Sequence, residues 1–417
     1  MANQKCPYFG NCGGCSLQHV GYTSQVENKK KALANALSGV GFDGSLVQVF
    51  SDGEYFYRNR MDMVFHPSGL GFRKKGDFRR VVDVAKCFIS EERLNWLIKE
   101  VREFFCGDCS DSFDLIKHSG TFRYAVIRTP GGGSPSYEGR ISCEDSGPHG
   151  NSDFCANDAS CGESVSCVDS SISFVLNGDS TRLDEAVAKI RLFAQKTTAN
   201  NVIVAYVPSN SDVSVSEDFF VVKGGDMLKA NLLGREFLFS VQGFFQNNTK
   251  MAEKMHKYIH ELFQKYDTGS FDGTRGAELL DLYGGVGTFG VNNADLFKKV
   301  TIVESFAASV ETAKLNIENN KITNATAVAL DARYLKRLNF LTPLFVLLDP
   351  PRSGMHPKTI ECLRKLKPKV IVYISCNVEQ LRKDVVKFKE YKIKNAAMFD
   401  LFPQTNHMES VVTMELK

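Results

Sequence analysis

The sequence predicts an α/β protein with a parallel sheet in its C-terminal half and a β-rich region before it. From about residue 278, apolar strand-like runs alternate with helix-like stretches, the pattern of right-handed crossovers and a parallel sheet covered on both faces. Before about residue 240, strand-like runs are short and are broken by Gly, Pro and Asp, as in β-rich domains. The 417 residues are enough for two or three domains.

The C-terminal strands indicate where a ligand should bind. Two closing strands are predicted in KIKNAAMFDLF and MESVVTMEL, with a long loop between them. Ligands in open parallel sheets bind beyond the carboxyl ends of the strands, so residues that follow a strand are the first candidates for chemistry. The parallel strands are expected at 278–283, 300–304, 325–330, 344–349 and 370–375.

Two helices frame the β-rich region. One is predicted at 24–38, where helix formers carry spaced apolar positions, and a second at 249–265 should join this region to the parallel sheet. Between them, strands are expected in MDMVFHP, LGFRKK, RRVVDVA, YAVIRTP, ISFVLN, NVIVAYV and DFFVVKGG.

Residues 131–170 differ in composition from the rest of the chain. They are rich in Gly, Ser and Asp, with seven acidic residues against one arginine, and we interpret them as a flexible acidic insertion. Their cysteines lack paired CxxC spacing, although CGDC lies nearby, so a solvated loop with incidental thiols is favoured over a second metal site. The cysteines concerned are Cys143, Cys155, Cys161 and Cys167, with Cys106 and Cys109 in CGDC.

Composition narrows the class of protein. No apolar run reaches the ~18 residues of a membrane span, and the first residues lack the apolar core of a signal peptide, so we expect a cytoplasmic enzyme. Twelve cysteines in such a chain favour metal or cluster binding or catalysis over disulfides. Net charge is +3, with positive ends and a negative middle segment at 131–240, a weak indication of a polyanionic partner.

A nucleoside cofactor is indicated by DLYGGVGTFG at 281–290. It supplies a strand, an acid and a glycine turn leading into a helix. Glu304 ends the next strand, where an acid binds both ribose hydroxyls, and Asp331 after the third strand could meet an adenine edge. A dinucleotide would require a G-x-G-x-x-G motif, whose backbone N–H groups bind the pyrophosphate. S-adenosylmethionine has no pyrophosphate and is favoured.

Two further strand ends carry reactive groups. LLDPPRSG ends the fourth strand in Asp349, which paired prolines hold in a rigid turn, and YISCN ends the fifth in Cys376. A lone cysteine is more often inert than reactive. Here the N-terminal dipole of the next helix, with Arg382 and Lys383, is expected to favour a thiolate.

A thiolate at this place suits one reaction in particular. Carbon 5 of uracil is a poor nucleophile, but thiolate addition at carbon 6 makes an enolate whose carbon 5 accepts a methyl group from a sulfonium donor. A base must then remove the proton from carbon 5. DLFPQTNHMES at 400–410 offers Glu409 and His407 for this step.

These residues resemble a known family, the S-adenosylmethionine-dependent RNA uracil-5-methyltransferases, which make 5-methyluridine in transfer and ribosomal RNA. The resemblance covers nearly the whole chain through FFQNN, DLYGGVGTFG, LLDPPRSG, YISCN and DLFPQTNHMES. It implies a Rossmann-like class I methyltransferase domain, Cys376 as nucleophile, Glu409 as base and Asp349 in the uracil pocket. It also implies cofactor contacts for Gln246, Tyr283, Glu304 and Asp331. Many members have Cys where this chain has Gly284, which also fits the turn.

The N-terminus adds four cysteines: Cys6, Cys12 and Cys15 in CPYFGNCGGC, and Cys87. By spacing alone they suit either zinc or an iron–sulfur cluster, since both take four thiolates. They resemble the [4Fe-4S] ligand set of the cluster-bearing branch of the family, where the role would be structural or in RNA binding. Only five residues precede the first of them, so we expect no leading TRAM barrel.

We therefore expect three units: an iron–sulfur segment with the start of the β-rich region (1–95), a central β-rich RNA-binding domain (96–245) and a methyltransferase domain (246–417). RNA contact is expected near YRNRMD, and at GFRKKGDFRR, whose arginines, lysines and phenylalanines suit phosphate and base stacking. GFRKKGDFRR is equally well interpreted as a basic hairpin that has no role in RNA binding.

The predicted function is methylation of carbon 5 of a flipped, unpaired uridine by a monomer that binds RNA and no membrane. 23S ribosomal RNA is slightly preferred over the T-loop of transfer RNA. Two alternatives stay open: an amine methyltransferase that uses the Asp-Pro-Pro turn without a nucleophile, and a non-catalytic iron–sulfur RNA-binding protein.

Overall fold

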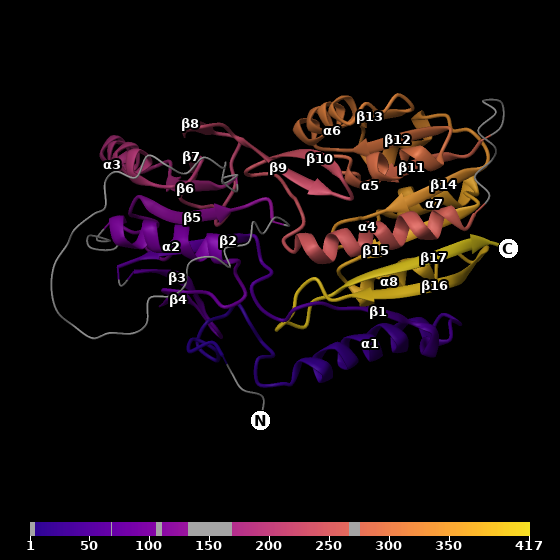
Figure 1. Ribbon diagram of the computed structural model, residues 1–417, viewed down its shortest axis with the longest axis horizontal. Coiled ribbons are helices and arrows are strands. Elements are labelled where there is room, and N and C mark those ends of the chain that lie inside the picture. The colour runs from indigo at the N-terminus through magenta and orange to yellow at the C-terminus, as the bar shows by residue number, and fades with distance from the viewer. Residues whose placement is uncertain (1–4, 68, 106–110, 132–168, 267–275) are drawn as a thin grey trace, which may run out of the picture.

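The computed structural model describes residues 5–67, 69–105, 111–131, 169–266 and 276–417. Two large sheets dominate these residues, one of seven strands and one of eight. The seven-stranded sheet lies on the left of Figure 1 and the eight-stranded sheet on the right. A two-stranded ribbon, β9 (Met227–Leu232) and β10 (Arg235–Ser240), lies between them.

The eight-stranded sheet has the order β1-β16-β17-β15-β14-β11-β12-β13. Its five central and outer strands from β15 to β13 are parallel, while β17 runs antiparallel to both β15 and β16. All seven predicted C-terminal strands are confirmed. Neighbours β11 and β14 are not consecutive in the chain, which makes their carboxyl ends the switch point where ligands bind. The strands are β1 (Gln48–Phe50), β11 (Glu278–Leu282), β12 (Lys299–Glu304), β13 (Ala325–Ala329), β14 (Leu344–Leu348), β15 (Val370–Ser375), β16 (Tyr391–Phe399) and β17 (Glu409–Leu416).

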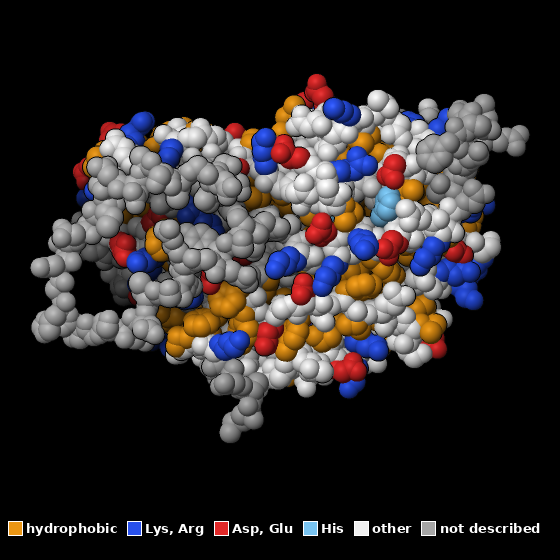
Figure 2. All heavy atoms as spheres, in the orientation of Figure 1, with side chains coloured by type: hydrophobic (Ala, Val, Ile, Leu, Met, Phe, Trp, Pro, Cys, Tyr) orange, Lys and Arg blue, Asp and Glu red, His pale blue; other side chains and the backbone are white. Residues whose placement is uncertain are grey.

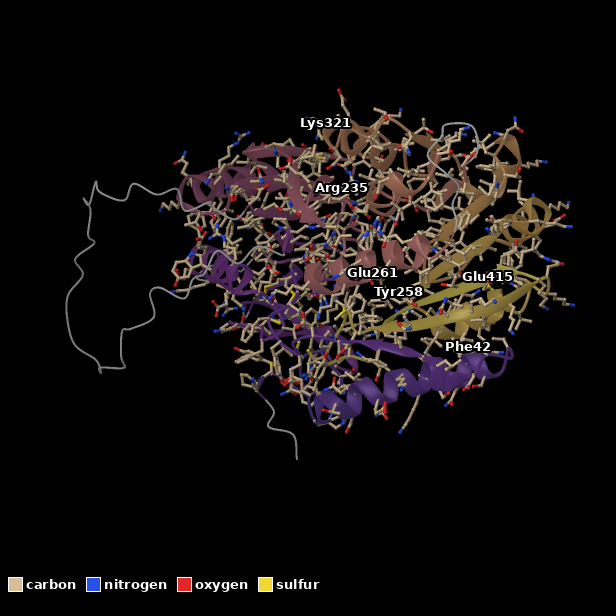
Figure 3. The ribbon with its side chains drawn as sticks, turned by 45° about the vertical axis from the view of Figure 1, so that its right-hand side comes forward. Phe42, Arg235, Tyr258, Glu261, Lys321 and Glu415 are labelled. Carbon is tan, nitrogen blue, oxygen red and sulfur yellow. The ribbon has the colours of Figure 1, made fainter. Side chains whose placement is uncertain are left out.

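Helices cover both faces of this sheet because its strands alternate apolar residues between two cores. Leu279 packs into one cluster and Leu280 into the other. Figure 3 places Tyr258 on one side of the β16–β17 pair and Phe42 on the other. One face carries α4 (Thr249–Gln264), α5 (Thr288–Asn292) and α6 (Ala307–Asn319), and the other α1 (Tyr22–Ser38), α7 (Pro357–Leu366) and α8 (Val378–Val385).

The N-terminal helix α1 packs on the C-terminal sheet (Figure 1). Strand β1 extends the same sheet as a parallel edge strand beside β16. The predicted unit 1–95 groups these elements with the β-rich region, whereas the structure joins residues 22–50 to the C-terminal core. Their apolar residues Leu33 and Leu37 are fully buried there, and burial against the nearest open face decided the placement.

The seven-stranded sheet has the order β4-β3-β2-β5-β6-β7-β8 and is antiparallel except between β6 and β7. Helix α3 (Leu183–Lys196) makes the crossover between those two strands. Helices α2 (Glu92–Phe105) and α3 pack on the sheet through a core shared with its strands, so this region is β-rich as predicted but is half-covered by helices. The strands are β2 (Arg60–His66), β3 (Gly69–Lys74), β4 (Asp77–Asp83), β5 (Phe122–Arg128), β6 (Ser171–Asn177), β7 (Asn201–Val207) and β8 (Phe219–Lys223).

The acidic insertion predicted at 131–170 lies outside the described residues except at its two ends, as do its four cysteines, Cys106 and Cys109. Short 3-10 helices occupy Gly44–Leu46, Ala294–Leu296 and Ala332–Arg337. Among the helices that the structure describes, none combines the length and apolar character that crossing a bilayer requires. Figure 2 shows Lys and Arg side chains interspersed with Asp and Glu on the face in view.

Candidate active site

Three predicted residues meet at the carboxyl ends of adjacent strands. Asp349 follows β14 and Cys376 follows β15, which are parallel neighbours. Glu409 begins β17, whose antiparallel register pairs Ser410 with Ser375. The next position in that register sets Glu409 beside Cys376, and the charges of both Glu409 and Asp349 act on the Cys376 thiol. The sheet thus brings a thiol and two carboxyl groups together.

Glu409 is buried and Asp349 is partly buried, and both acids hold their protons to higher pH than usual. Burial raises the pKa of Asp349 to about 7, and the nearby Asp281 carboxylate adds to the shift. Burial, followed by the charge of Asp349, raises the pKa of Glu409 well above its ordinary value. Carboxyl groups shifted in this way are suited to proton transfer near neutral pH.

Arg382 and Lys383 of α8, the cations expected to favour the Cys376 thiolate, are not among the groups that shift its pKa. Burial raises the pKa of the Cys376 thiol, and the charges of Glu409 and Asp349 add to this, while Arg352 opposes it. Arg382 and Lys383 lie in the last turn of α8, away from its N-terminus. The cation that favours the thiolate is therefore Arg352 of the DPPR turn, which sequence reasoning passed over.

The turn that carries Asp349 and Arg352 is held by hydrogen bonds to Asp384, which is fully buried. Asp384 accepts hydrogen bonds from Met355 N at 3.0 Å and from Tyr373 Oη at 2.8 Å. Asn377 caps α8 and donates from Nδ2 to Arg352 O at 3.1 Å. These bonds tie the turn to the strand and helix on either side of Cys376, so that the two chain segments hold one geometry.

The glycine turn after β11 is shaped by close packing. A Cβ at Gly284 would lie 2.6 Å from Ile302 Cγ2, whereas a Cβ at Gly285 would meet no atom within 4 Å. Gly284 therefore fits the turn in this chain, and a side chain there would require Ile302 to move. The open side at Gly285 leaves room for a ligand against the backbone.

Two acids hold this turn. Asp281 is fully buried and accepts from Gly290 N at 2.8 Å through Oδ2, while its Oδ1 has no partner among the described residues. Burial raises the pKa of Asp281 to about 7. Glu304 accepts from Gly285 N at 3.2 Å and from Phe306 N at 2.9 Å. An orphaned buried oxygen beside an open glycine turn fits a polar ligand such as the amino-acid part of S-adenosylmethionine.

The other predicted cofactor residues are distributed around this turn. Tyr283 has φ of 66° and its pKa is raised to about 12 by burial, with Asp331 and Glu304 adding to the shift. These three therefore lie near one another. Asp331 also binds Arg333, with 2.6 Å between Oδ2 and Nη2. Gln246 is half-buried, and its carbonyl accepts from Asn59 Nδ2 at 3.1 Å.

His407, the alternative base, lies on the loop before Glu409 and is exposed. Partial burial lowers its pKa, and the charges of Arg352, Lys29 and Arg58 lower it further. This loop therefore faces a group of cations. Glu409 is buried beside the thiol and is better placed than His407 for a proton transfer at that point.

The N-terminal cysteines are brought together in one cavity. Cys6, Cys12, Cys15 and Cys87 all line a cavity of about 170 Å³ at the edge of the seven-stranded sheet. Burial raises the pKa of Cys12 to about 11 and that of Cys15 to about 12, and the neighbouring cysteines add to both shifts. Within the described ranges, no three His, Cys or acidic side chains are arranged to hold a metal ion.

Two kinds of ligand take four thiolates. A single zinc ion requires all four sulfurs about 2.3 Å from one centre. In a four-iron cluster each cysteine binds a different iron, so the thiolates stand farther apart. The four cysteines that line this cavity match the number of thiolates that either ligand takes.

Several site residues escaped sequence reasoning. Arg352, Asp384 and Asn377 act through contacts between segments, and only their closeness to DPPR and YISCN signalled them. Phe244 in FFQNN is 72% exposed although its neighbour Phe245 is buried. An exposed phenylalanine two residues before Gln246 is a candidate base-stacking surface.

Comparisons with known proteins point to one family. Residues 226–417 match the family model described as tRNA (Uracil-5-)-methyltransferase. The chain is 30% identical to the tRNA (uracil(54)-C(5))-methyltransferase of Pyrococcus horikoshii over 98% of this chain and 85% of the relative. It is likewise 30% identical to the enzyme of the same name from Pyrococcus furiosus, over 98% and 84%.

A solved structure covers the same extent. The crystal structure of the Pyrococcus abyssi tRNA (uracil-54, C5)-methyltransferase in complex with S-adenosyl-L-homocysteine matches 97% of this chain and 86% of that chain. The TM-score is 0.71 and the sequence identity 27%. The similarity therefore includes both sheets and is not confined to the C-terminal one.

Proposed function

Because the chain belongs to the S-adenosylmethionine-dependent RNA uracil-5-methyltransferases, we propose that it methylates a uridine of transfer RNA, at the position that corresponds to uridine 54. The observation that carries the chemistry is the meeting of Cys376, Glu409 and Asp349 at one edge of the sheet. The transfer-RNA target rests on the relatives, whose names specify tRNA uracil 54. The ribosomal preference expected from the sequence has no support among them.

In the proposed mechanism the Cys376 thiolate forms a bond to carbon 6 of the flipped uracil, and the ring electrons move to the carbon 4 oxygen as an enolate. S-adenosylmethionine supplies the methyl group that carbon 5 then takes up. Glu409 removes the proton from carbon 5, and the returning electron pair expels Cys376 as thiolate. Arg352 favours the ionised thiol at the start and at the end of this cycle.

Asp349 is proposed to face the uracil ring. With its pKa at about 7, its carboxyl group can donate as well as accept a hydrogen bond near neutral pH, as a uracil edge with one N–H and two carbonyl oxygens requires. For the cofactor we propose Glu304 at the ribose hydroxyls, Asp331 and Tyr283 at the base and Gln246 on the opposite side of the crevice. Asp331 is also paired with Arg333, so it would bind both Arg333 and the cofactor base if the proposed contact forms.

The target is tested by methylation of two RNAs in parallel. We expect labelled methyl groups to enter a transfer RNA transcript as 5-methyluridine, and not to enter the same transcript with cytidine in place of uridine 54. Digestion to nucleosides and mass spectrometry identify the product. Preferential labelling of 23S ribosomal RNA would restore the expectation from the sequence, and methylation of an exocyclic amine would favour the alternative without a nucleophile.

For the four cysteines we propose a [4Fe-4S] cluster, supported by their shared cavity. The thiols must lose their protons to bind iron, and burial makes those protons harder to remove. The binding energy of the cluster must therefore exceed the free energy of that deprotonation. Protein purified without oxygen is expected to contain about four iron and four sulfide per chain. Cys87→Ser should lower both, whereas Cys362→Ser on α7 should not. Zinc in place of iron would refute the cluster.

A further inference from the structure

The loop that joins β16 to β17, residues 400–408, leads directly to Glu409. We call it the base loop. Its far side is held by residues of the N-terminal segment, which are far away in the sequence. This contact is part of the reason that α1 lies against the C-terminal sheet (Figure 1).

The centre of the base loop is a reciprocal pair of buried amides. Gln25 of α1 accepts from Gln404 N at 3.1 Å, and its Nε2 donates to Gln404 Oε1 at 2.9 Å. The carbonyl of Gln404 accepts from Ser16 N at 2.9 Å and Leu17 N at 3.0 Å. Gln25 is fully buried and Gln404 is 1% exposed, so water cannot replace these bonds.

The backbone at Gln404 also needs this support. Its φ is 67°, in the left-handed region that a non-glycine residue enters at a cost in free energy. Such a conformation persists where surrounding contacts determine it. Here the side chain, the N–H and the carbonyl of Gln404 are all bonded to residues outside the base loop.

Other N-terminal residues hold the loop before Gln404. Lys29 Nζ lies 2.6 Å from Asp400 Oδ1, both buried, and donates to Phe402 O at 3.1 Å. Tyr57 Oη donates to Pro403 O at 2.9 Å. The first half of the base loop, residues 400–404, is thus bonded to the N-terminal segment, which contributes to its conformation.

We propose that Gln25 and Gln404 are positioning residues for proton removal: they hold the base loop so that Glu409 faces carbon 5 of a uracil bound to Cys376. The proposal rests on the proposed function. Ser16 follows Cys15 directly in the chain, so the segment that carries the cysteine set also supports the base loop.

The test replaces Gln25 with methionine, which keeps the side-chain length and removes the hydrogen bonds. We expect methyl transfer to change by less than about threefold and release of product to slow about 10- to 100-fold, the effect of a small misplacement of a catalytic group. The methylated protein–RNA adduct should then persist on denaturing gels in single-turnover reactions. Hydrogen exchange in a peptide covering 400–408 should become faster.

The matched control is Asn177→Leu, which also removes a buried amide that binds backbone groups, Gly120 O at 2.9 Å and Asp179 N at 3.2 Å, but in the other sheet. It should lower stability without separating the two steps. A second variant, Gln404→Gly, keeps the left-handed backbone and its bonds to Ser16 and Leu17, and should give a smaller delay. Gln404→Gly takes the place of Gln25→Met in the test if Gln25→Met does not fold.

The inference is overturned if Gln25→Met, or Gln404→Gly in its place, releases product at the wild-type rate or slows both steps equally. Its failure is separable from failure of the proposed function. If wild-type protein forms no 5-methyluridine, the proposed function is wrong. If wild-type protein forms it while the Gln25 and Gln404 variants behave like Asn177→Leu, only the positioning role is wrong.

Discussion

Replacing Cys376 with alanine is expected to lower the rate of 5-methyluridine formation at least about 10⁴-fold, because no enolate forms at carbon 5 without addition at carbon 6. Binding of S-adenosylmethionine should be unchanged, since the glycine turn and Glu304 lie on other strands. The measurement is mass spectrometry of protein incubated with methyl donor and RNA that contains 5-fluorouridine. Fluorine blocks the final proton removal, so wild-type protein should accumulate a methylated adduct at Cys376.

The matched control for this variant is Cys362→Ala, since Cys362 is also a partly buried free cysteine but lies on α7 outside the site. It should form the adduct as wild type does. Turnover by Cys376→Ala would exclude the carbon 5 mechanism and favour the amine methyltransferase. A protein that binds RNA but neither consumes the methyl donor nor forms an adduct would favour the non-catalytic reading.

Replacing Glu409 with glutamine is expected to slow turnover about 10²- to 10⁴-fold and to trap the methylated adduct with ordinary uridine. The amide keeps the size of the side chain but cannot take the proton from carbon 5. A denaturing gel with labelled RNA shows the adduct, and single-turnover kinetics show whether methyl transfer itself is preserved. Glu415→Gln on the same strand, a partly buried acid bonded to Lys394 and Tyr266, is the control.

The Glu409 carboxyl group also determines whether activity rises or falls with pH. Burial and Asp349 hold the proton on Glu409 to higher pH than usual, and only the ionised form can act as base. Burial also raises the pKa of Cys376, which must be a thiolate. Both shifts make activity low on the acid side and rising through neutral pH. Rates that fall between about pH 6 and pH 8 would contradict Glu409 as the base.

Much of the C-terminal fold was predictable because its strands are short apolar runs between helices. Each expected strand from 278 onward appears within a residue of its predicted bounds, except that KIKNAAMFDLF extends three residues past the end of β16. In the N-terminal half the seven strands of the other sheet are predicted, whereas the strands β1, β9 and β10 and the helices α2 and α3 are not. Both helices have an apolar stripe, with Leu94, Leu97 and Ile98 buried in α2 and Ile190 and Phe193 in α3. Neither stripe is part of a sequence motif, and turn residues surround both helices in the sequence.

The positions of the site residues could be predicted from the sequence, but their ionisation could not. Asp349 and Cys376 could be placed together from sequence because each ends a parallel strand, and strand ends share one edge of a sheet. The state of the thiol could not be predicted, because a pKa depends on burial and on charges from other segments. The helix cations expected to act on Cys376 lie in the last turn of α8, and Arg352 is the cation that favours the thiolate instead.

The sequence by itself determined the alternation of strands and helices from residue 278 onward, the motifs at the strand ends and the family, because these depend on local pattern and composition. Only the tertiary structure decided that α1 and β1 join the C-terminal sheet and that Gln25 and Lys29 hold the loop before Glu409. The contacts of Gln25 and Lys29 join residues more than 370 positions apart. Hydrogen bonds at such separation leave no periodic signal in the chain and arise only when burial brings the segments together.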